Sequence, residues 1–584
     1  MSTIKSSAEN LTLNADGAGN DILFQSNGVQ KASLTDGGVF TATSFVGSGA
    51  ALTGVGVATQ LTATSNIGLG TGAVDSITTG DYNVGLGDNA GTAITSGSEN
   101  TAVGFNSLLT NTTGTSNVSV GLESLKLNTT GASNTSIGHS ALQANTTASN
   151  NTAVGKSALQ ANTTGASNTA VGYQALDANT TGADNTALGA YALTRATTAS
   201  YNTAVGNVAL QSVTTGASNT AVGYLSLEAN TTAHSNTAIG TKSLAANTTG
   251  EENTAVGEFA LFTNTTAGNN TAIGKAALKL NTTGASNTAV GNYSLDANTT
   301  GSYNTAMGYN ALTSNTTSSS NTAFGFYALA NTTTGDYNVA FGKNTLITTT
   351  TGYNNTASGS EALHELTTGS YNTAIGFQAG YNVTIGQNNV FVGRKAGFYG
   401  TSLTTGTTST FLGSYAYPTS SGCTQALVIG HAVGGADGYT TIGHGSADIR
   451  AAHGTASWAA VSDERYKKDI VDSTAGLSFV NALQPRTFKY KNLGELPTTF
   501  NAYEADSTEV FKNSNTNHGF IAQEVKAAID ADSSIKDGFR MWDDRDDGSQ
   551  EVGEAALIPV LVKAIQELST KNDALEARIT ALEG

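Results

Sequence analysis

A period of 17 residues governs the middle of this chain. An asparagine opens a near-constant five-residue motif at each step, with no insertion between the first step and the last. These asparagines are Asn66, Asn83, Asn100, Asn117, Asn134, Asn151, Asn168, Asn185, Asn202, Asn219, Asn236, Asn253, Asn270, Asn287, Asn304, Asn321, Asn338, Asn355, Asn372 and Asn389. Loops tolerate insertions, whereas stacked coils hold each residue type above its counterpart in the previous coil. The invariant length therefore predicts a β-solenoid over residues 61–393.

The unit at residues 168–184 shows why such coils must stack. Thr-Ala-Val at 169–171 is a short alternating strand, Gly172 ends it, and Leu176 supplies a second apolar contact. Asn-Thr-Thr-Gly at 179–182 is a sequence typical of a turn. One unit cannot bury its own apolar face, but stacked neighbours can. At the usual spacing between strands, the array predicts a rod of roughly 95 Å.

Three features of the coil have more than one interpretation. Residues 173–178 and their equivalents are compatible with a second strand or with a short helical turn. Asn-Thr-Thr matches the glycosylation sequon, but a ladder of stacked asparagines is the favoured interpretation. The variable residues before each strand, such as Tyr201, His234 and Tyr303, form either a ligand-facing stripe or, as we favour, a solvated face.

One small branched residue and one leucine per coil make a thin core for a single solenoid. Three chains around a common axis would bury more apolar surface per residue, which favours a homotrimer. The coils are similar to the left-handed β-roll repeats of trimeric autotransporter adhesin heads, whose units carry an Asn-x-x-[Val/Ala]-[Ile/Val]-Gly core and are usually shorter. The predicted fold class is mainly β: a trimeric β-solenoid rod, followed by a small α+β domain that ends in a coiled coil.

Composition excludes several classes of function. Charged residues make up 12% of the chain, and the net charge is −17 without a basic cluster, which argues against nucleic-acid binding. Cys423 is the single cysteine, so no intrachain disulfide is expected. The N-terminus lacks the apolar segment of a signal peptide, and no run of about 18 apolar residues occurs. We expect no export by the ordinary route, no membrane insertion and no cofactor.

The two ends of the array differ from its middle. Residues 1–60 show short alternating strands with glycine-containing turns, predicted to form an attachment region. Beyond residue 393 the motif arrives three residues late at Ser409, recurs 17 residues later at Ala426, and recurs only 13 residues after that at Tyr439. Insertions in a solenoid map to loops that often bind, so residues 394–461 are a candidate receptor-binding tip; a tapering cap is the alternative. Its aromatic and histidine residues are Tyr399, Tyr415, Tyr417, His431, Tyr439, His444, His453 and Trp458. His431 and His444 have no suitably spaced acidic partner, so no metal site is predicted.

Where the array ends, the sequence reads Ser462-Asp463-Glu464-Arg465-Tyr466-Lys467. A serine hydroxyl needs an adjacent base to act as a nucleophile at neutral pH. A lysine serves when desolvation lowers its pKa, and Lys468 is the neighbouring rival of Lys467. A spacing of five does not place both residues on one helix face, so they would meet across a turn or between subunits. The plain alternative is that Ser462 caps a helix, with acidic residues in its first turn.

This motif resembles the auto-processing site of the C-terminal intramolecular chaperone of endosialidase-type phage tailspikes and tail fibres. The resemblance continues in order over residues 462–584, through Ile470, Leu483-Gln484-Pro485, Phe488-Lys489-Tyr490, residues 518–525 and residues 564–568. It implies that Ser462 is the nucleophile, Lys467 the base, and Val461–Ser462 the bond broken after trimerisation. The residues that match the chaperone motif are Asp463, Arg465, His518, Gly519, Phe520, Gln523 and Glu524.

The last residues carry heptads that predict a coiled coil over 556–583. Isoleucines and one asparagine fall at position a, and leucines fall at position d: Ile558, Ile565, Asn572 and Ile579, and Leu561, Leu568, Leu575 and Leu582. Isoleucine at a with leucine at d favours two strands, whereas the resemblance implies three.

The resemblance implies a phage tail fibre that attaches to a host receptor, expected to be a glycan. Its trimer would be aligned by a self-processing serine peptidase domain. It would be assembled in the host cytoplasm, carried in the virion and joined to other tail proteins by its N-terminus. Two other hypotheses are a tailspike depolymerase of host polysaccharide and a non-viral surface adhesin. The depolymerase needs paired carboxylates, and the array offers only scattered acids such as Glu251, Glu252 and Glu258.

Overall fold

The computed structural model describes residues 22–26, 29–34, 40–42, 65–454, 459–460, 470–500, 502–532, 535, 541–544, 549–553 and 556–584. The chain divides into two compact units, Met1–Ala460 and Val461–Gly584. Near the N-terminus, β1 (Ile22–Ser26), β2 (Val29–Leu34) and β3 (Phe40–Ala42) form an antiparallel sheet in that order. Among the described helices, none combines the length and the apolar character needed to span a bilayer.

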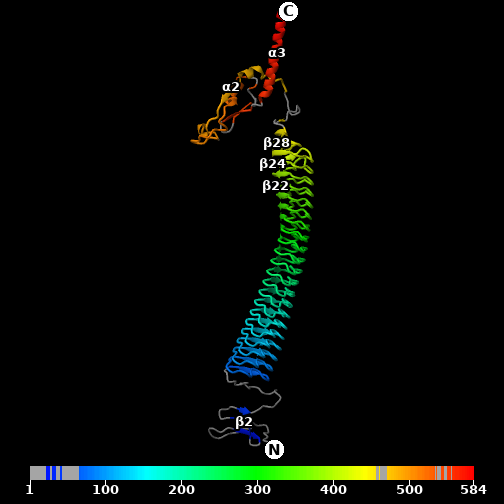
Figure 1. Ribbon diagram of the computed structural model, residues 1–584, viewed down its shortest axis with the longest axis vertical. Helices are drawn as coiled ribbons and strands as arrows, with labels where there is room; N and C mark the ends of the chain where they lie inside the picture. Colours follow the sequence, from blue (N-terminus) through cyan, green and yellow to red (C-terminus); the bar gives the residue numbers. More distant parts are fainter. Residues whose placement is uncertain are drawn as a thin grey trace, which may run out of the picture. The chain divides into compact units, whose positions relative to one another are not determined.

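A β-solenoid of 22 turns follows (Figure 1). Each turn contributes one three-residue strand that pairs in parallel with the strand of the next turn, so that Thr169 faces Thr186 and Ala170 faces Ala187. The predicted solenoid is therefore confirmed. Its regular strands are β4 (Ile67–Leu69), β5 (Val84–Leu86), β6 (Thr101–Val103), β7 (Val118–Val120), β8 (Thr135–Ile137), β9 (Thr152–Val154), β10 (Thr169–Val171), β11 (Thr186–Leu188), β12 (Thr203–Val205), β13 (Thr220–Val222), β14 (Thr237–Ile239), β15 (Thr254–Val256), β16 (Thr271–Ile273), β17 (Thr288–Val290), β18 (Thr305–Met307), β19 (Thr322–Phe324), β20 (Val339–Phe341), β21 (Thr356–Ser358), β22 (Thr373–Ile375), β23 (Val390–Val392) and β24 (Thr410–Leu412).

The segment left open by the sequence is neither a strand nor a helical turn. It is a chain of turns in which Gln174 has φ 52° and Leu176 has φ 54°. A leucine in this left-handed region costs roughly 1 kcal/mol. Its side chain is fully buried, and burial contributes about 2 kcal/mol. The backbone N–H of Leu176 also donates to the carbonyl of Ala192 in the next turn, at 2.9 Å. Stacking therefore stabilises a backbone that one isolated unit would not adopt.

The first asparagine of each turn forms a buried ladder. The backbone N–H of Asn185 and its side-chain amide both donate to Oδ1 of Asn168, each at 3.0 Å. The amide of Asn168 donates to the carbonyl of Gly182 at 2.8 Å. Both asparagines are buried, and a buried amide is tolerated only when it is hydrogen-bonded. The asparagine in each repeat is thus the polar core of the coil.

The second asparagine of the repeat, in the Asn-Thr-Thr-Gly turn, forms another ladder. The amide of Asn179 donates to Oδ1 of Asn162 at 2.7 Å and to the carbonyl of Gly182 at 2.9 Å. Asn179 is fully buried. The sequon asparagines of this ladder are therefore structural, which agrees with the interpretation of Asn-Thr-Thr as part of a ladder of stacked asparagines.

The glycine that follows each strand is required by the close approach of two turns. Gly172 has φ +139°, and a Cβ there would lie 2.6 Å from the carbonyl of Gly189. Only glycine adopts this backbone region without strain. The spacing between coils therefore fixes this residue type in every turn.

The parallel ladder continues past residue 393. β26 (Leu427–His431) and β28 (Tyr439–His444) add to β24 in parallel. The chain then reverses, and β29 (Ala447–Ala452) and β30 (Ala459–Ala460) pair antiparallel, while β25 (Tyr417–Pro418) pairs with β27 (Gly434–Gly435). The three-residue insertion lies between Phe398 and Leu403, where Leu403 bonds back to Gly397. The segment predicted as an irregular tip is thus the last part of the solenoid with an antiparallel hairpin on its edge.

The second unit is a small α+β domain. Its elements are α1 (Leu477–Ala482), β31 (Arg486–Phe488), the 3-10 turn η2 (Leu493–Glu495), β32 (Asn517–Gly519), α2 (Ala522–Ala531), β33 (Trp542–Asp544), β34 (Gln550–Val552) and α3 (Leu557–Glu583). β31 pairs antiparallel with β32, and β33 with β34. The core joins the three helices, with Phe479 of α1, Val525 and Ile529 of α2, and Val560 of α3 all buried.

Candidate functional site

The predicted processing residues Val461, Ser462, Asp463, Arg465 and Lys467 lie outside the described residues. The Ser462–Lys467 dyad and the Val461–Ser462 cleavage site therefore stay predictions. The other half of the motif, residues 518–524, is described and shows how that half is built.

The described half begins on β32 and ends in the first turn of α2. His518 pairs with Thr487 of β31, and Gly519 pairs with Arg486. Phe520 packs against the domain core. Gln523 and Glu524 lie in the first turn of α2, where the helix dipole favours an acidic side chain.

Arg486 holds Glu524 in a two-pronged ion pair. Its Nε donates to one carboxylate oxygen at 2.9 Å, and its Nη2 donates to the other at 2.6 Å. The Arg486 guanidinium holds the pKa of the Glu524 carboxyl below its usual range, and Glu524 raises the pKa of Arg486. A bidentate pair fixes geometry as well as charge, so β31 is tied to the start of α2.

Sequence reasoning missed Arg486. It lies between two stretches that carried the resemblance, and 38 residues separate it from its partner. No spacing rule connects residues so far apart. The nearest base in the sequence, Lys526, is two residues from Glu524, a spacing that does not bring two side chains together on one helix face.

A second carboxylate joins α3 to α1. The backbone N–H of Leu477, the first residue of α1, donates to Oε2 of Glu567 at 2.9 Å. This bond satisfies one of the free N–H groups at the start of a helix. A Cβ on Gly476 would collide with the same carboxylate. Glu567 therefore positions the C-terminal helix on the domain.

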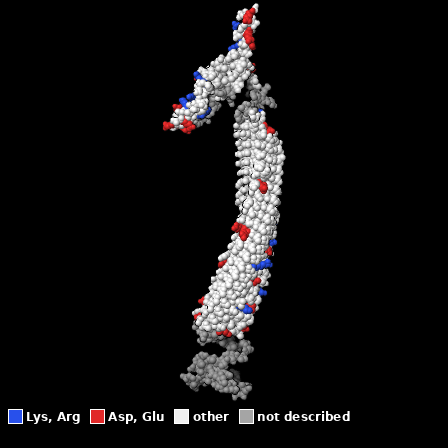
Figure 2. Space-filling view, viewed as in Figure 1, with Lys and Arg blue, Asp and Glu red and all other residues white. Residues whose placement is uncertain are grey.

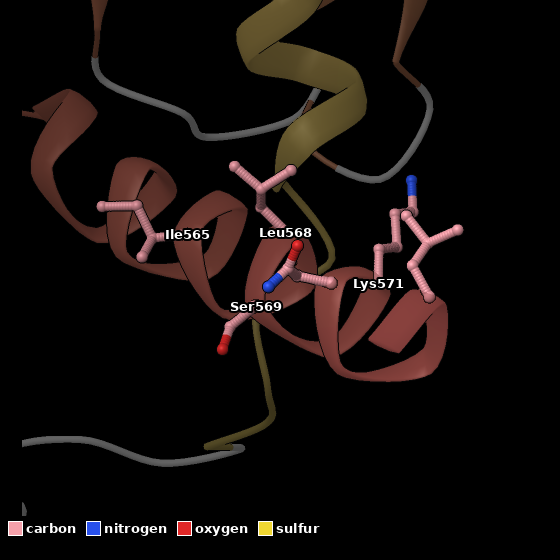
Figure 3. A pocket seen from close by; sticks show the side chains of 6 residues that line it. Ile565, Leu568, Ser569 and Lys571 are labelled. Atoms are coloured by element: carbon pink, nitrogen blue, oxygen red, sulfur yellow. The ribbon is translucent and has the colours of Figure 1, made fainter. Parts of the chain in front are cut away.

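The predicted heptad positions lie on the exposed side of α3. Val560 and Ala564 face the domain core, whereas Ile565 is 65% exposed and Leu568 is 55% exposed. Figure 3 shows Ile565 and Leu568 on this helix, with Ser569 and Lys571 nearby; Leu575 and Asn572 line the same depression. An apolar seam of this kind is the surface through which coiled-coil helices pair.

The C-terminal turns of the solenoid carry a file of contacting rings. His431 stacks on His444 with ring centres 5.1 Å apart, and Tyr415 meets His431 edge-on at 5.7 Å. Tyr399 meets Tyr415 at 4.9 Å, and the Arg394 guanidinium lies 5.3 Å from the Tyr415 ring. Within the described residues, no group of three or more histidine, cysteine or acidic side chains is placed to hold a metal ion. Trp458 lies outside the described residues.

Two further side chains in the first unit, a thiol and a carboxylate, are of reactive types. Cys423 is buried, and burial raises the pKa of its thiol to about 11, so it is a poor nucleophile. Glu258, one of the scattered acids, pairs with Lys275 at 3.0 Å on the surface.

Comparison with known proteins gives a family match for the C-terminal unit. Residues 462–532 match the family model described as chaperone of endosialidase, which is a peptidase family. No curated protein and no solved structure matches the chain. A chaperone domain of this family that follows a β-solenoid of 17-residue repeats in the sequence indicates a protein of the tailspike or tail-fibre type.

Proposed function

We propose that this chain is a homotrimeric tail fibre that mediates attachment to a host receptor. In this proposal its C-terminal domain aligns three copies and then cuts itself off at Val461–Ser462. The observation that carries the proposal is the family match, which begins at Ser462. The chain also divides into compact units between Ala460 and Val461, one residue from the proposed bond.

A chaperone at the end of a repetitive rod has a physical purpose. Identical turns can pair in the wrong register, because a slip by one turn still matches nearly every residue. Long-range pairing is also slow to nucleate. A C-terminal clamp would fix the register before the rod assembles. Its removal then raises the barrier to unfolding without adding a contact.

The cut is tested with the full-length protein. Denaturing gels of the purified wild type are expected to show two fragments, 1–461 and 462–584, and Ser462→Ala is expected to leave one band. Ser462→Asp is the matched control, because aspartate still caps a helix but cannot attack a peptide bond. A trimeric wild type that stays in one piece would overturn self-cleavage. Lys467→Ala and Lys468→Ala, compared side by side, identify the base.

Attachment is proposed for the last turns of the solenoid, with a glycan as the receptor. The file of rings that contains Tyr399, Tyr415 and His431 supports this placement, because aromatic side chains bind sugar faces well. The N-terminal region would join the fibre to other tail proteins in a particle assembled in the host cytoplasm. Binding of the purified protein to host cells, with Tyr399→Ala compared against Tyr201→Ala in the middle of the rod, tests the placement. Equal binding by both variants would contradict the placement of the receptor site in the last turns of the solenoid.

A further inference from the structure

An uncharged apolar stripe runs along the solenoid on the outer side of its strands. In β5–β24 the middle residue is buried, and the first and third residues face outward. We call the first and third residues of β4–β24 the strand face. Its third residues are Leu69, Leu86, Val103, Val120, Ile137, Val154, Val171, Leu188, Val205, Val222, Ile239, Val256, Ile273, Val290, Met307, Phe324, Phe341, Ser358, Ile375, Val392 and Leu412. Ser358 is the one polar residue among these third residues, whereas most first residues are threonine, as at Thr169 and Thr186.

Many of these third residues are exposed in the single chain. Leu188 is 48% exposed, Ile375 is 47% exposed, and Ile239 and Ile273 are each 40% exposed. A file of apolar third residues of this length is unusual on the surface of a monomer in water. The exposure therefore points to a surface that is covered in the working molecule.

Charge is confined to other positions of the repeat. Two residues beyond the strand, the same turn position carries Lys156, Glu258, Lys275 and Arg394 in different turns. No residue of the strand face in β4–β24 is charged. Figure 2 shows a solenoid surface with few charges, which gather in small groups. A merely solvated strand face would accept lysine or glutamate as readily as the position two residues away.

The strand face is large enough for a stable interface. With turns about 4.8 Å apart and a face about 10 Å wide, 22 turns present roughly 1,000 Å² per chain. A standard interface buries about 800 Å² on each partner. Only a partner with the same spacing between turns can match such a face along its whole length, and a second copy of this chain has that spacing.

The C-terminal helix supplies an independent reason to expect copies side by side. The seam of α3 that contains Ile565, Leu568 and Leu575 is also exposed. Pairing of these seams would join copies of the chain through their C-terminal units. We propose that copies of the solenoid pack together through the strand face, with these faces turned towards a common axis. This inference rests on the proposed oligomer and assigns the surface that forms it.

The strand face also contains residues whose sizes distinguish one alignment of two copies from another. Phe324 and Phe341 stack with ring centres 5.0 Å apart, and the next third residue is the small Ser358. A slip of one turn would set a phenylalanine of one copy beside the serine of another. Bulky and small residues in sequence therefore distinguish the correct alignment from a slipped one.

Cysteine cross-linking of the full-length protein tests the assignment. Leu188→Cys places a thiol on the strand face, and Thr181→Cys places one in the exposed turn of the neighbouring coil. Cys423 is not expected to react with the cross-linker, because it is buried and the pKa of its thiol is raised. A short bismaleimide is expected to link most Leu188→Cys chains into dimers on denaturing gels, and few Thr181→Cys chains. Equal linking of the two variants, or linking of Thr181→Cys alone, would overturn the assignment.

Light scattering on the same samples separates the two proposals. A monomeric wild type would contradict the proposed homotrimer itself. A trimer in which Leu188→Cys does not cross-link would contradict only the strand face. As a second measurement, Leu188→Lys is expected to lower the fraction of trimer at least tenfold relative to Thr181→Lys. Equal trimer fractions in these two lysine variants would also overturn the assignment.

Discussion

Asn179 ends a file of stacked asparagines because Ala196 occupies the equivalent position in the next turn. The Asn179 amide donates to Asn162 at 2.7 Å, but among the described residues its Oδ1 has no hydrogen-bond donor although it is buried. Val213 follows Ala196 at this position, and the file resumes at Asn230. The repeat thus contains a defect at a defined place, and each unpaired buried oxygen costs about 1 to 3 kcal/mol.

Repair of this defect is expected to be cooperative. Ala196→Asn alone gives Asn179 a donor but leaves a new unpaired oxygen beside Val213, so little change in stability is expected. Ala196→Asn with Val213→Asn joins the file to Asn230 and is expected to stabilise these turns by roughly 1 to 3 kcal/mol. Thermal unfolding of the wild type, both single variants and the double variant measures the coupling. Strictly additive effects would contradict the ladder explanation.

Removal of an asparagine from the first ladder is expected to open the coil locally. Asn168→Ala deprives the backbone N–H and the side chain of Asn185 of their shared acceptor, which costs roughly 2 to 4 kcal/mol. Asn207→Ala is the matched control, because the amide of Asn207 makes an exposed bond to Ala190. Hydrogen exchange at Asn185 is the measurement. It should accelerate at least tenfold in the first variant and stay unchanged in the second.

Substitution of the glycine after a strand is expected to be severe. In Gly172→Ala the new Cβ meets the carbonyl of Gly189 at 2.6 Å from a backbone at φ +139°, so the two turns must separate. A loss of more than about 3 kcal/mol is expected. Gly182→Ala also brings a Cβ close to a carbonyl, that of Ala199, but its φ is negative and the chain itself has alanine there in four other turns. The yield of folded protein and its melting temperature compare the two variants. Similar losses would show that φ is not the deciding factor.

The Arg486–Glu524 pair is expected to make the C-terminal domain acid-sensitive. The folded-state pKa of Glu524 is lower than its usual value. The ionised carboxylate therefore favours the folded domain at neutral pH, and that contribution is lost as the pH falls through the lowered value. Glu524→Gln should lower the melting temperature at pH 7 but have little effect in strong acid. Asp530→Asn, which affects a surface pair with Lys526 on the same helix, is the control. A pH-independent difference between wild type and Glu524→Gln would contradict this cause.

Part of the candidate site was predictable from the chain alone and part was not. The order of motifs in residues 462–584 predicted the chaperone domain that the family match supports. Arg486 and Glu567 were not predicted as partners of Glu524 and Leu477, because each pair joins elements that are distant in the sequence. A salt bridge between strand and helix leaves no periodic trace. The proposed dyad of Ser462 and Lys467 stays a prediction from the sequence.

The sequence by itself determined that this protein is a stack of turns, because only equal coils require a constant length of 17 residues and an asparagine and a glycine at fixed places. The tertiary structure decided the path within each turn. Leu176 adopts a left-handed backbone that no local propensity favours, and burial against neighbouring turns stabilises it. It also decided which side of the strand is buried within the coil, because Ala170 lies in the core whereas the larger and more apolar Val171 faces outward. Contacts between turns, which the order of residues does not contain, supplied these answers.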